Sequence, residues 1–223
     1  MNTEKDINQL TSLLMRSVSP FHCVLAASRF LEQKGFTRLD LTDAWDLKPE
    51  QGYYLPVFDS SLIAFTTGEN CICKTAPGGA PLSPAPVPAL RMEAAHTDWP
   101  CLKLKPSPEV STSRYGKLNV EVYGSPILST WMDRPLSLAG KVCAAGETPF
   151  SPSVHIVDIK RPVAVIPNLA IHMNREVNSG VALNPQKDML PILTLLGENT
   201  DKDHCLVNLL ARETGCAPEE ILD

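Results

Sequence analysis

The residues of this chain best suited to chemistry are His96 and Asp98, two positions apart at the end of an apolar run. Apolar and charged residues alternate before them, so a strand over residues 90–98 would place the apolar side chains, His96 and Asp98 on one face. An imidazole whose second nitrogen is held by a carboxylate is the arrangement that a metal-binding histidine needs. The pattern therefore predicts a metal ligand at His96, at the carboxyl end of a strand.

A single histidine does not make a zinc site, because zinc in proteins takes about three or four protein ligands. No second cluster of ligand-type residues follows before the sequence ends at Asp223. Taken by itself, a lone His-x-Asp is more often a structural or surface pair. Either the motif is incidental, or this chain carries one part of a larger site.

Other groups with ligand or nucleophile chemistry are weaker candidates. Cys71 and Cys73 lack a second pair, and Cys205 next to His204 would diverge on a helix. No Gly-x-Ser-x-Gly elbow and no glycine-rich phosphate loop occur. We interpret His22 as structural, and His155 and His204 as surface residues.

The composition describes a globular protein of 223 residues, enough for one large or two small domains. A net charge of -5 offers no basic surface for nucleic acid or anionic lipid. The polar N-terminus and the absence of a long apolar stretch predict neither a signal peptide nor a membrane span. Seven scattered cysteines favour reduced thiols and a cytoplasmic location.

The first hundred residues mix helix and strand signals. Apolar periodicity predicts a helix over about residues 4–16 and a second that begins at Ser19-Pro20 and ends at Lys34-Gly35. Two strands are expected around the turn at residues 59–61. Residues 77–88 hold five prolines, which predicts a loop.

After Asp98 the pattern becomes one of short alternating strands broken by glycine and proline. These strand-like runs lie at 102–105, 117–122, 136–143, 154–159 and 163–166. They predict a β-rich module with a closed or sandwiched sheet. A final helix is expected between a cap at Asp201 or Asp203 and Gly215.

Ten segments, in order along the chain, together resemble the aspartyl aminopeptidase family of zinc metallopeptidases. The segments are 19–22, 44–47, 61–65, 95–98, 120–124, 130–134, 136–140, 161–162, 166–172 and 183–186. The resemblance implies an α/β fold: a partial phosphorylase/hydrolase-like α/β peptidase domain plus an inserted β-rich oligomerisation domain. Residues 1–97 would be the first part of the peptidase domain. Residues 98–223 would be the dimerisation insert with its C-terminal helix.

By the same resemblance, His96 is a zinc ligand and Asp98 is the acid that orients it. His172 matches a histidine that enters a neighbouring subunit's active site and stabilises the oxyanion of the reaction. Trp99 departs from the serine that is common in the family, and a bulky indole there would narrow the site or shift the hinge. The general-base glutamate and the remaining ligands of a dinuclear zinc site belong to the second half of the peptidase domain, which this sequence lacks.

The expected function is thus that of the N-terminal half of a zinc aminopeptidase that removes N-terminal amino acids from peptides. The family forms homo-oligomers, so self-association is the expected partner relation, and the isolated chain is expected to be inactive. The alternative is a non-catalytic self-association module derived from the family. A third possibility is a nonfunctional fragment.

Overall fold

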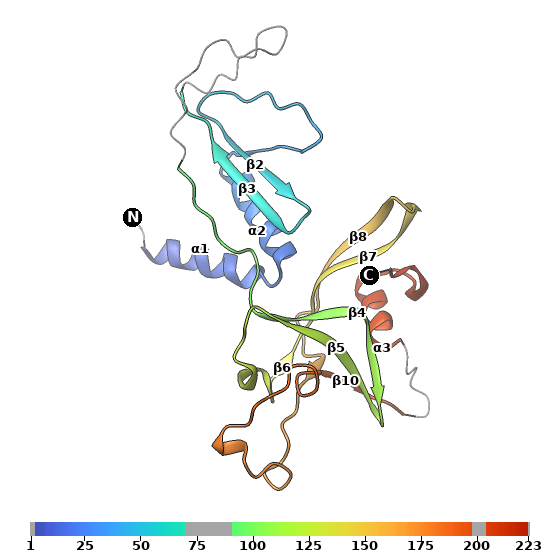
Figure 1. The fold of residues 1–223 in the computed structure, drawn as a ribbon. Helices are drawn as coiled ribbons and strands as arrows, with labels where there is room; N and C mark the ends of the chain where they lie inside the picture. The colour runs from blue at the N-terminus through green and yellow to red at the C-terminus, as the bar shows by residue number, and fades with distance from the viewer. Residues whose placement is uncertain (1–2, 70–90, 198–203, 223) are drawn as a thin grey trace. The chain divides into compact units, whose positions relative to one another are not determined.

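The computed structural model describes residues 3–69, 91–197 and 204–222 of the chain (Figure 1). It divides into two compact units, Met1–Asp98 and Trp99–Asp223, which are described separately below. The predicted proline loop, Cys71, Cys73 and the predicted caps Asp201 and Asp203 lie outside the described residues. No helix in the described part of the chain is long and apolar enough to cross a membrane.

The first unit begins with the two predicted helices, α1 (Thr3–Arg16) and α2 (Pro20–Gln33). The Ser19 side chain accepts a hydrogen bond from the backbone N–H of His22, and Pro20 occupies the first turn of α2. Gly35, with φ of 83°, follows the last turn of α2, where a left-handed backbone suits glycine. Both helices and their boundaries confirm the sequence-based prediction.

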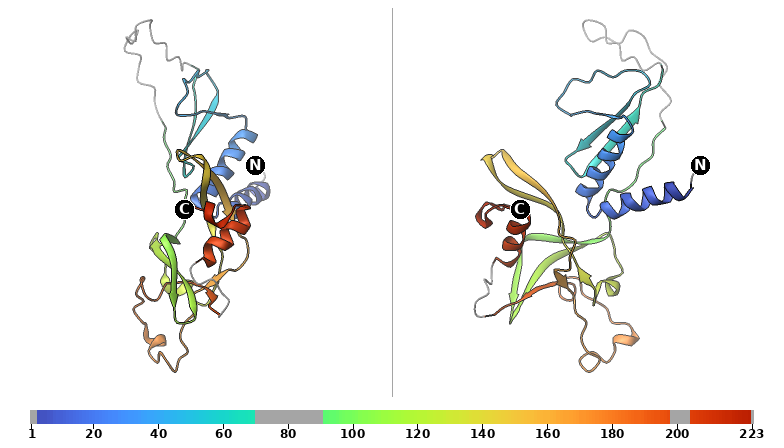
Figure 2. Two further views of the ribbon diagram at one scale, coloured as in Figure 1. Left: turned by 90° about the vertical axis from the view of Figure 1, so that its right-hand side faces the viewer. Right: turned by 180° about the vertical axis from the view of Figure 1, so that it is seen from behind.

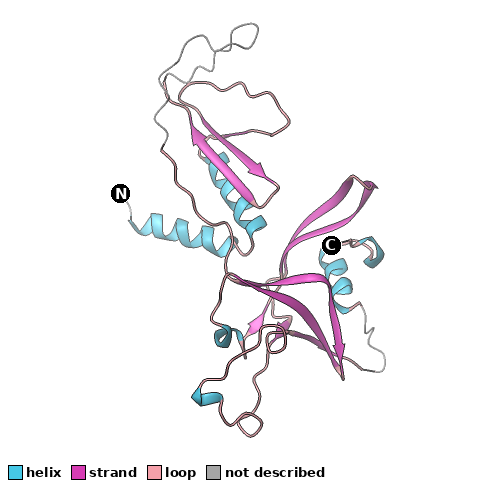
Figure 3. Ribbon diagram, viewed as in Figure 1, coloured by secondary structure: helices cyan, strands magenta, loops and turns pink. Residues whose placement is uncertain are grey.

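A three-stranded sheet lies beside α2, in the order β1 (Thr37–Arg38), β2 (Gly52–Val57) and β3 (Ser61–Thr66). Strands β2 and β3 form an antiparallel hairpin, as predicted (Figure 3). Strand β1 adds a short parallel edge. Phe58 and Asp59 at the hairpin turn have φ of 51° and 60°. The turn is therefore tight, and the Ser60 carbonyl is presented at the end of the hairpin.

The core of the first unit is centred on β2, which buries three consecutive residues. Tyr54 is fully buried, and its hydroxyl donates a 2.5 Å hydrogen bond to Oε1 of Glu32 on α2. On the opposite face, the Tyr53 ring stacks on Phe65 with the ring centroids 5.6 Å apart. Both faces of β2 are covered, so the hairpin is a firm support for its turn.

The described residues of the second unit form the β-rich part of the chain and the α-helix α3 (Figure 2). Its elements are β4 (Cys101–Thr112), β5 (Tyr115–Tyr123), η1 (Leu128–Trp131), β6 (Pro135–Leu136), β7 (Ala139–Thr148), β8 (Ser151–Asp158), β9 (Ala164–Val165), η2 (Val177–Ser179), β10 (Ile192–Leu195), α3 (Cys205–Thr214) and η3 (Pro218–Glu220).

The main sheet of the second unit has the order β4-β5-β10-β9-β6, and its pairings are antiparallel. Among the described residues, strands β4 and β6 are its outer strands. The closed form of the predicted sheet is therefore wrong, and its sandwiched form stays a prediction. Strands β6 and β9 pair through two residues each. Strands β7 and β8 form a separate hairpin.

Helix α3 joins the main sheet to the β7–β8 hairpin through two apolar clusters. Leu118, Val120 and Leu206 form the first cluster, and Val142, Val157 and Ile159 form the second. Leu138 and Leu210 pack against both clusters. Burial of each such side chain contributes about 1.5–3 kcal/mol, so α3 supplies a large part of the cohesion of this unit.

The N-terminus of α3 is capped by a residue far away in the sequence. Oε1 of Glu109 accepts a 2.6 Å hydrogen bond from the backbone N–H of Leu206, and the side chain of His204, at the N-cap position, makes no capping bond. Glu109 lies just after the register shift in β4 between Leu104 and Glu109. The α-helix itself and its left-handed Gly215 end confirm the predicted C-terminal helix.

We predict that Tyr54→Phe changes how stability depends on pH. Burial, with the hydrogen bond to Glu32 as a second cause, raises the pKa of Tyr54 to about 12 from 10.0. The folded chain therefore holds this proton more tightly than the unfolded chain. The stabilisation is fully present below pH 10 and is lost as the pH rises toward 12.

Urea unfolding at pH 8 to 12 measures the effect. The difference in unfolding free energy between the parent and Tyr54→Phe should shrink across this window. Tyr115→Phe, at a half-exposed tyrosine of the second unit, is the control and should show no such change. Parallel pH curves for the parent and Tyr54→Phe would contradict the assignment.

We also predict that Glu109→Ala lowers the free energy of unfolding by about 1–2 kcal/mol, because the N-terminus of α3 loses its acceptor. Circular dichroism during urea unfolding measures this loss. Glu121→Ala removes an exposed carboxylate 3.6 Å from Lys105 on the neighbouring strand and is the control, with an expected change below about 0.5 kcal/mol. Equal losses for the two variants would show that Glu109 is not a cap.

Candidate functional site

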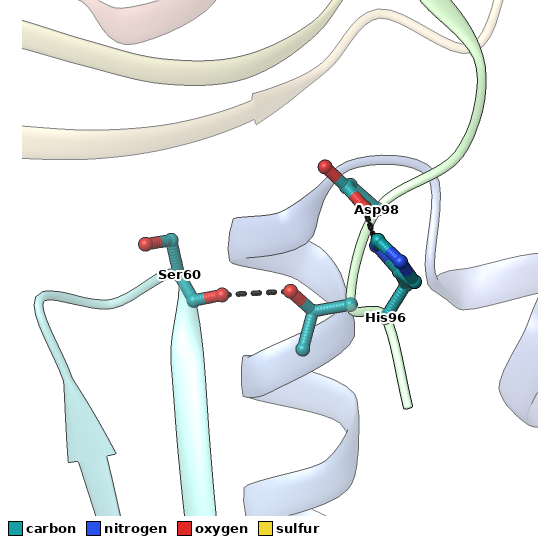
Figure 4. Close-up of polar contacts among 4 residues, drawn as sticks. Ser60, His96 and Asp98 are labelled. Atoms are coloured by element: carbon teal, nitrogen blue, oxygen red, sulfur yellow. Dashed lines mark hydrogen bonds and ion pairs between the residues drawn. The ribbon is translucent and has the colours of Figure 1, made fainter. Parts of the chain in front are cut away.

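His96 and Asp98 contact each other in the structure (Figure 4). Nδ1 of His96 lies 3.0 Å from Oδ1 of Asp98, which places the proton-bearing nitrogen of a neutral imidazole on the carboxylate side. The His96 side chain is 88% exposed, whereas that of Asp98 is 19% exposed. The imidazole is therefore held at one nitrogen, and Nε2 is left as the atom that can bind a ligand.

Thr97, between these two residues, fixes the tripeptide to the sheet of the first unit. Its hydroxyl donates a 2.8 Å hydrogen bond to the Ser60 carbonyl at the β2–β3 turn (Figure 4). The turn itself is braced by the buried β2 strand. The position of the His96 imidazole is thus set by the hairpin rather than by a strand of its own.

The prediction that residues 90–98 form a strand is wrong for the part of this run that the structure describes. Residues 91–98 carry no strand, and β4 begins at Cys101. The alternating side chains are exposed, including Met92 at 78%, so no apolar surface covers the face that they share. A strand also needs a paired neighbour, and no described strand pairs with this run.

The described residues do not make a complete zinc site. No group of three or more histidine, cysteine, aspartate or glutamate side chains among them could hold a metal ion. His96 offers one imidazole nitrogen, in an orientation and exposure that suit a ligand. The arrangement can supply one ligand of a zinc coordination shell, and the other ligands would have to come from residues outside the described part of the chain.

His172 belongs to the second unit, whereas His96 and Asp98 belong to the first. It sits in an exposed turn where the Ala170 carbonyl accepts hydrogen bonds from the N–H groups of Met173 at 2.8 Å and Asn174 at 3.2 Å. Its apolar neighbours Leu169, Ile171 and Met173 are 56%, 45% and 74% exposed. The turn therefore presents a histidine among uncovered apolar side chains.

Asp133 anchors the start of the segment that carries His172. Its carboxylate accepts hydrogen bonds from the Asn168 N–H at 2.8 Å and from Asn168 Nδ2 at 3.2 Å, and its own N–H donates to the Ile166 carbonyl. Asp133 adopts φ of 54°, a conformation that aspartate tolerates better than most residues. This clamp joins the segments 130–134 and 166–172, which the resemblance had marked separately.

The remaining histidines differ in their surroundings. His22 is half-buried and its Nδ1 lies 2.8 Å from the Ser19 hydroxyl at the start of α2, which fits a structural role. His204 is exposed before α3. His155 is half-buried rather than a plain surface residue, and its Nε2 lies 3.0 Å from the Ser153 hydroxyl and 3.4 Å from the Cys216 thiol.

Comparison with known proteins gives a consistent result. Residues 13–223 match the family model described as "Aminopeptidase I zinc metalloprotease (M18)". The chain is 42% identical over 216 residues to the "Probable M18 family aminopeptidase 2" of Clostridium acetobutylicum, covering 96% of this chain and 47% of that protein. This chain therefore spans about half the length of the curated relatives that it matches.

Solved structures agree in fold. The chain superposes with a TM-score of 0.77 and 31% identity on a chain in the "Cryo-EM structure of the Ape4 and Nbr1 complex", covering 96% of this chain and 42% of that one. It superposes with a TM-score of 0.73 and 26% identity on mApe1 of Chaetomium thermophilum, covering 96% and 48%. The predicted mixed helix and sheet class is confirmed.

We predict that Asp133→Ala loosens the segment around His172. The variant loses two hydrogen bonds, each worth about 0.5–1.5 kcal/mol, so local opening should rise by about tenfold. Trypsin cleavage after the exposed Arg175, followed by mass spectrometry, reports this opening. Asp158→Ala, which removes an acid 3.9 Å from exposed Lys160, is the control. Unchanged cleavage in Asp133→Ala would contradict the clamp.

Proposed function

Because this chain belongs to the aminopeptidase I zinc metalloprotease family, M18, we propose that it acts as the N-terminal half of a dinuclear zinc aminopeptidase. The proposed reaction is removal of the N-terminal amino acid from peptides. The observation that carries the proposal is the His96–Asp98 pair, whose free Nε2 is exposed and whose Nδ1 is held by a carboxylate. This pair lies within the part of the chain that matches the family model.

In this proposal His96 binds zinc through Nε2, and Asp98 holds the imidazole in the orientation and tautomer that binding requires. Thr97 sets the position of both by its bond to the β2–β3 turn. Zinc, when bound, would supply Lewis-acid polarisation of the scissile carbonyl and a water of lowered pKa. The general base and the other ligands would come from residues outside this chain.

His172 has a separate proposed role in a neighbouring subunit. A histidine on an exposed turn, flanked by uncovered apolar side chains, is suited to insertion into a partner surface. There the imidazole would donate a hydrogen bond to the negative charge that develops on the substrate oxygen. The Asp133 clamp would hold the turn in place for this contact.

We further propose a homo-oligomer in the cytoplasm that acts on peptides, without nucleic-acid or membrane partners. A net charge of -5 supports the absence of a nucleic-acid partner. The second unit would be the oligomerisation insert and the first unit would be the beginning of the peptidase domain. Trp99, the first residue of the second unit and 48% exposed, would in this proposal narrow the site or shift the hinge.

A second candidate function is a non-catalytic self-association module. The exposed apolar side chains at Leu169, Ile171 and Met173 favour it, because a clamped turn of this kind can bind a second copy without any chemistry. The two proposals differ in their need for His96, which the module does not use.

The decisive test of the enzyme proposal joins this chain in frame to the second half of the Clostridium acetobutylicum relative. With zinc added, the chimera should release the N-terminal amino acid from short peptides. His96→Ala should lower kcat/KM by about 100-fold or more, because the site loses a ligand. His204→Ala, at an exposed histidine before α3, is the control and should keep full activity. Equal activity of the two variants would contradict the role of His96.

A zinc titration of the 223-residue chain tests the incompleteness of its site. One imidazole gives a weak bond, so we expect a Kd above about 1 µM by isothermal titration calorimetry. Submicromolar binding that is lost in His96→Ala would show that this chain builds a full site by itself.

A further inference from the structure

A second group of reactive side chains lies in the second unit, away from the His96–Asp98 pair in the sequence. The Cys216 thiol is 3.4 Å from Nε2 of His155, within hydrogen-bond range for sulfur. Both residues are half-buried. The Ser153 hydroxyl lies 3.0 Å from the same nitrogen. The imidazole thus faces a nucleophile and a competing hydroxyl at one atom.

The backbone around Cys216 is held on both sides. Before it, Gly215 closes α3 in a left-handed conformation, and the Thr214 hydroxyl accepts a 3.3 Å hydrogen bond from the Cys216 N–H. After it, Glu220 accepts a 2.8 Å hydrogen bond from the Ala217 N–H within η3. The backbone that carries Cys216 is therefore hydrogen-bonded on both sides, and its thiol lies next to His155 on β8.

From this geometry we propose that Cys216 is a site of thiol–disulfide exchange with low-molecular-weight disulfides, with His155 as its base. A thiolate is the attacking species in such exchange, and a neighbouring imidazole is the group that most often generates it. The site is independent of the proposed peptidase function. Its product is a mixed disulfide on Cys216.

The exchange balances in two steps. The Cys216 proton moves to Nε2 of His155, and the Sγ atom bonds to one sulfur of the disulfide as the disulfide bond breaks. The departing thiolate takes the proton from the imidazolium. The Cys216 thiol is oxidised to the mixed disulfide, and the second half of the small disulfide is reduced to a thiol.

Ser153 competes with Cys216 for the imidazole, which gives a second way to test the role of His155. The lone pair of a neutral Nε2 accepts one hydrogen, so the Ser153 hydroxyl and the Cys216 thiol compete for it. Removal of the hydroxyl leaves the nitrogen to the thiol. Ser153→Ala should therefore keep or raise the reactivity of Cys216, whereas His155→Gln should lower it.

Modification at this position would act on the segment that follows. Ile221 packs against the cluster of Val142, Val157 and Ile159 and bridges to Ala144 on β7. The Leu222 N–H donates to the Cys143 carbonyl. A bulky group on Cys216 would lie where this segment joins the hairpin.

The test uses the reduced 223-residue chain and glutathione disulfide. Samples taken over time are blocked with N-ethylmaleimide, digested with trypsin and analysed by mass spectrometry. Cleavage at lysine and arginine places Cys143, Cys205 and Cys216 on separate peptides, so each rate is read in the same sample. We expect Cys216 to react at least about tenfold faster than Cys143 and Cys205. In concentrated urea the three rates should converge.

The variants decide the role of the base. His155→Gln should reduce the Cys216 rate by about tenfold, to that of the other two cysteines, and Ser153→Ala should not reduce it. Equal rates for the three cysteines in the folded parent would overturn the proposal. So would an unchanged Cys216 rate in folded His155→Gln. If that variant fails to fold, the parent measurement in buffer and in urea still decides.

Discussion

The hydrogen bond from the Thr97 hydroxyl to the Ser60 carbonyl connects the candidate ligand to an ordered sheet. Residues 91–96 carry no secondary structure, so the position of His96 depends on this attachment. The attachment in turn depends on the β2–β3 hairpin, whose strand β2 is central in the sheet and buries Tyr53, Tyr54 and Leu55. A single imidazole is thus positioned by the core of the first unit, through a tight turn and one side-chain bond.

The local elements of this fold follow from short-range signals in the sequence. Ser19-Pro20 and Gly215 mark helix boundaries through capping and left-handed geometry, which are decided by neighbouring residues. Strand β10 was not predicted, because its apolar run does not alternate and matches neither period clearly. Its place between β5 and β9 depends on partners far away in the chain. Local periodicity does not predict long-range strand pairing of this kind.

The candidate site also combines local contacts, which the sequence predicts, with long-range contacts, which it does not. The contact between His96 and Asp98 was predictable, because two residues of spacing fix it. The strand predicted over residues 90–98 was wrong for residues 91–98. A strand requires a paired neighbour, which the described chain does not provide for this run. The contact between His155 and Cys216 spans 61 residues and had no sequence signal, since the two meet only after α3 has packed beside β8.

The remote cap of α3 has a consequence for the order in which the chain folds. An isolated helix of 10 residues is marginal in water, and α3 lacks a local side-chain cap. Its acceptor, Glu109, lies 97 residues earlier, next to an irregularity in β4. The β4–β5 hairpin can form from adjacent residues, whereas the helix gains its cap after that hairpin exists. The cap of α3 therefore couples the stability of this helix to that of the β4–β5 hairpin.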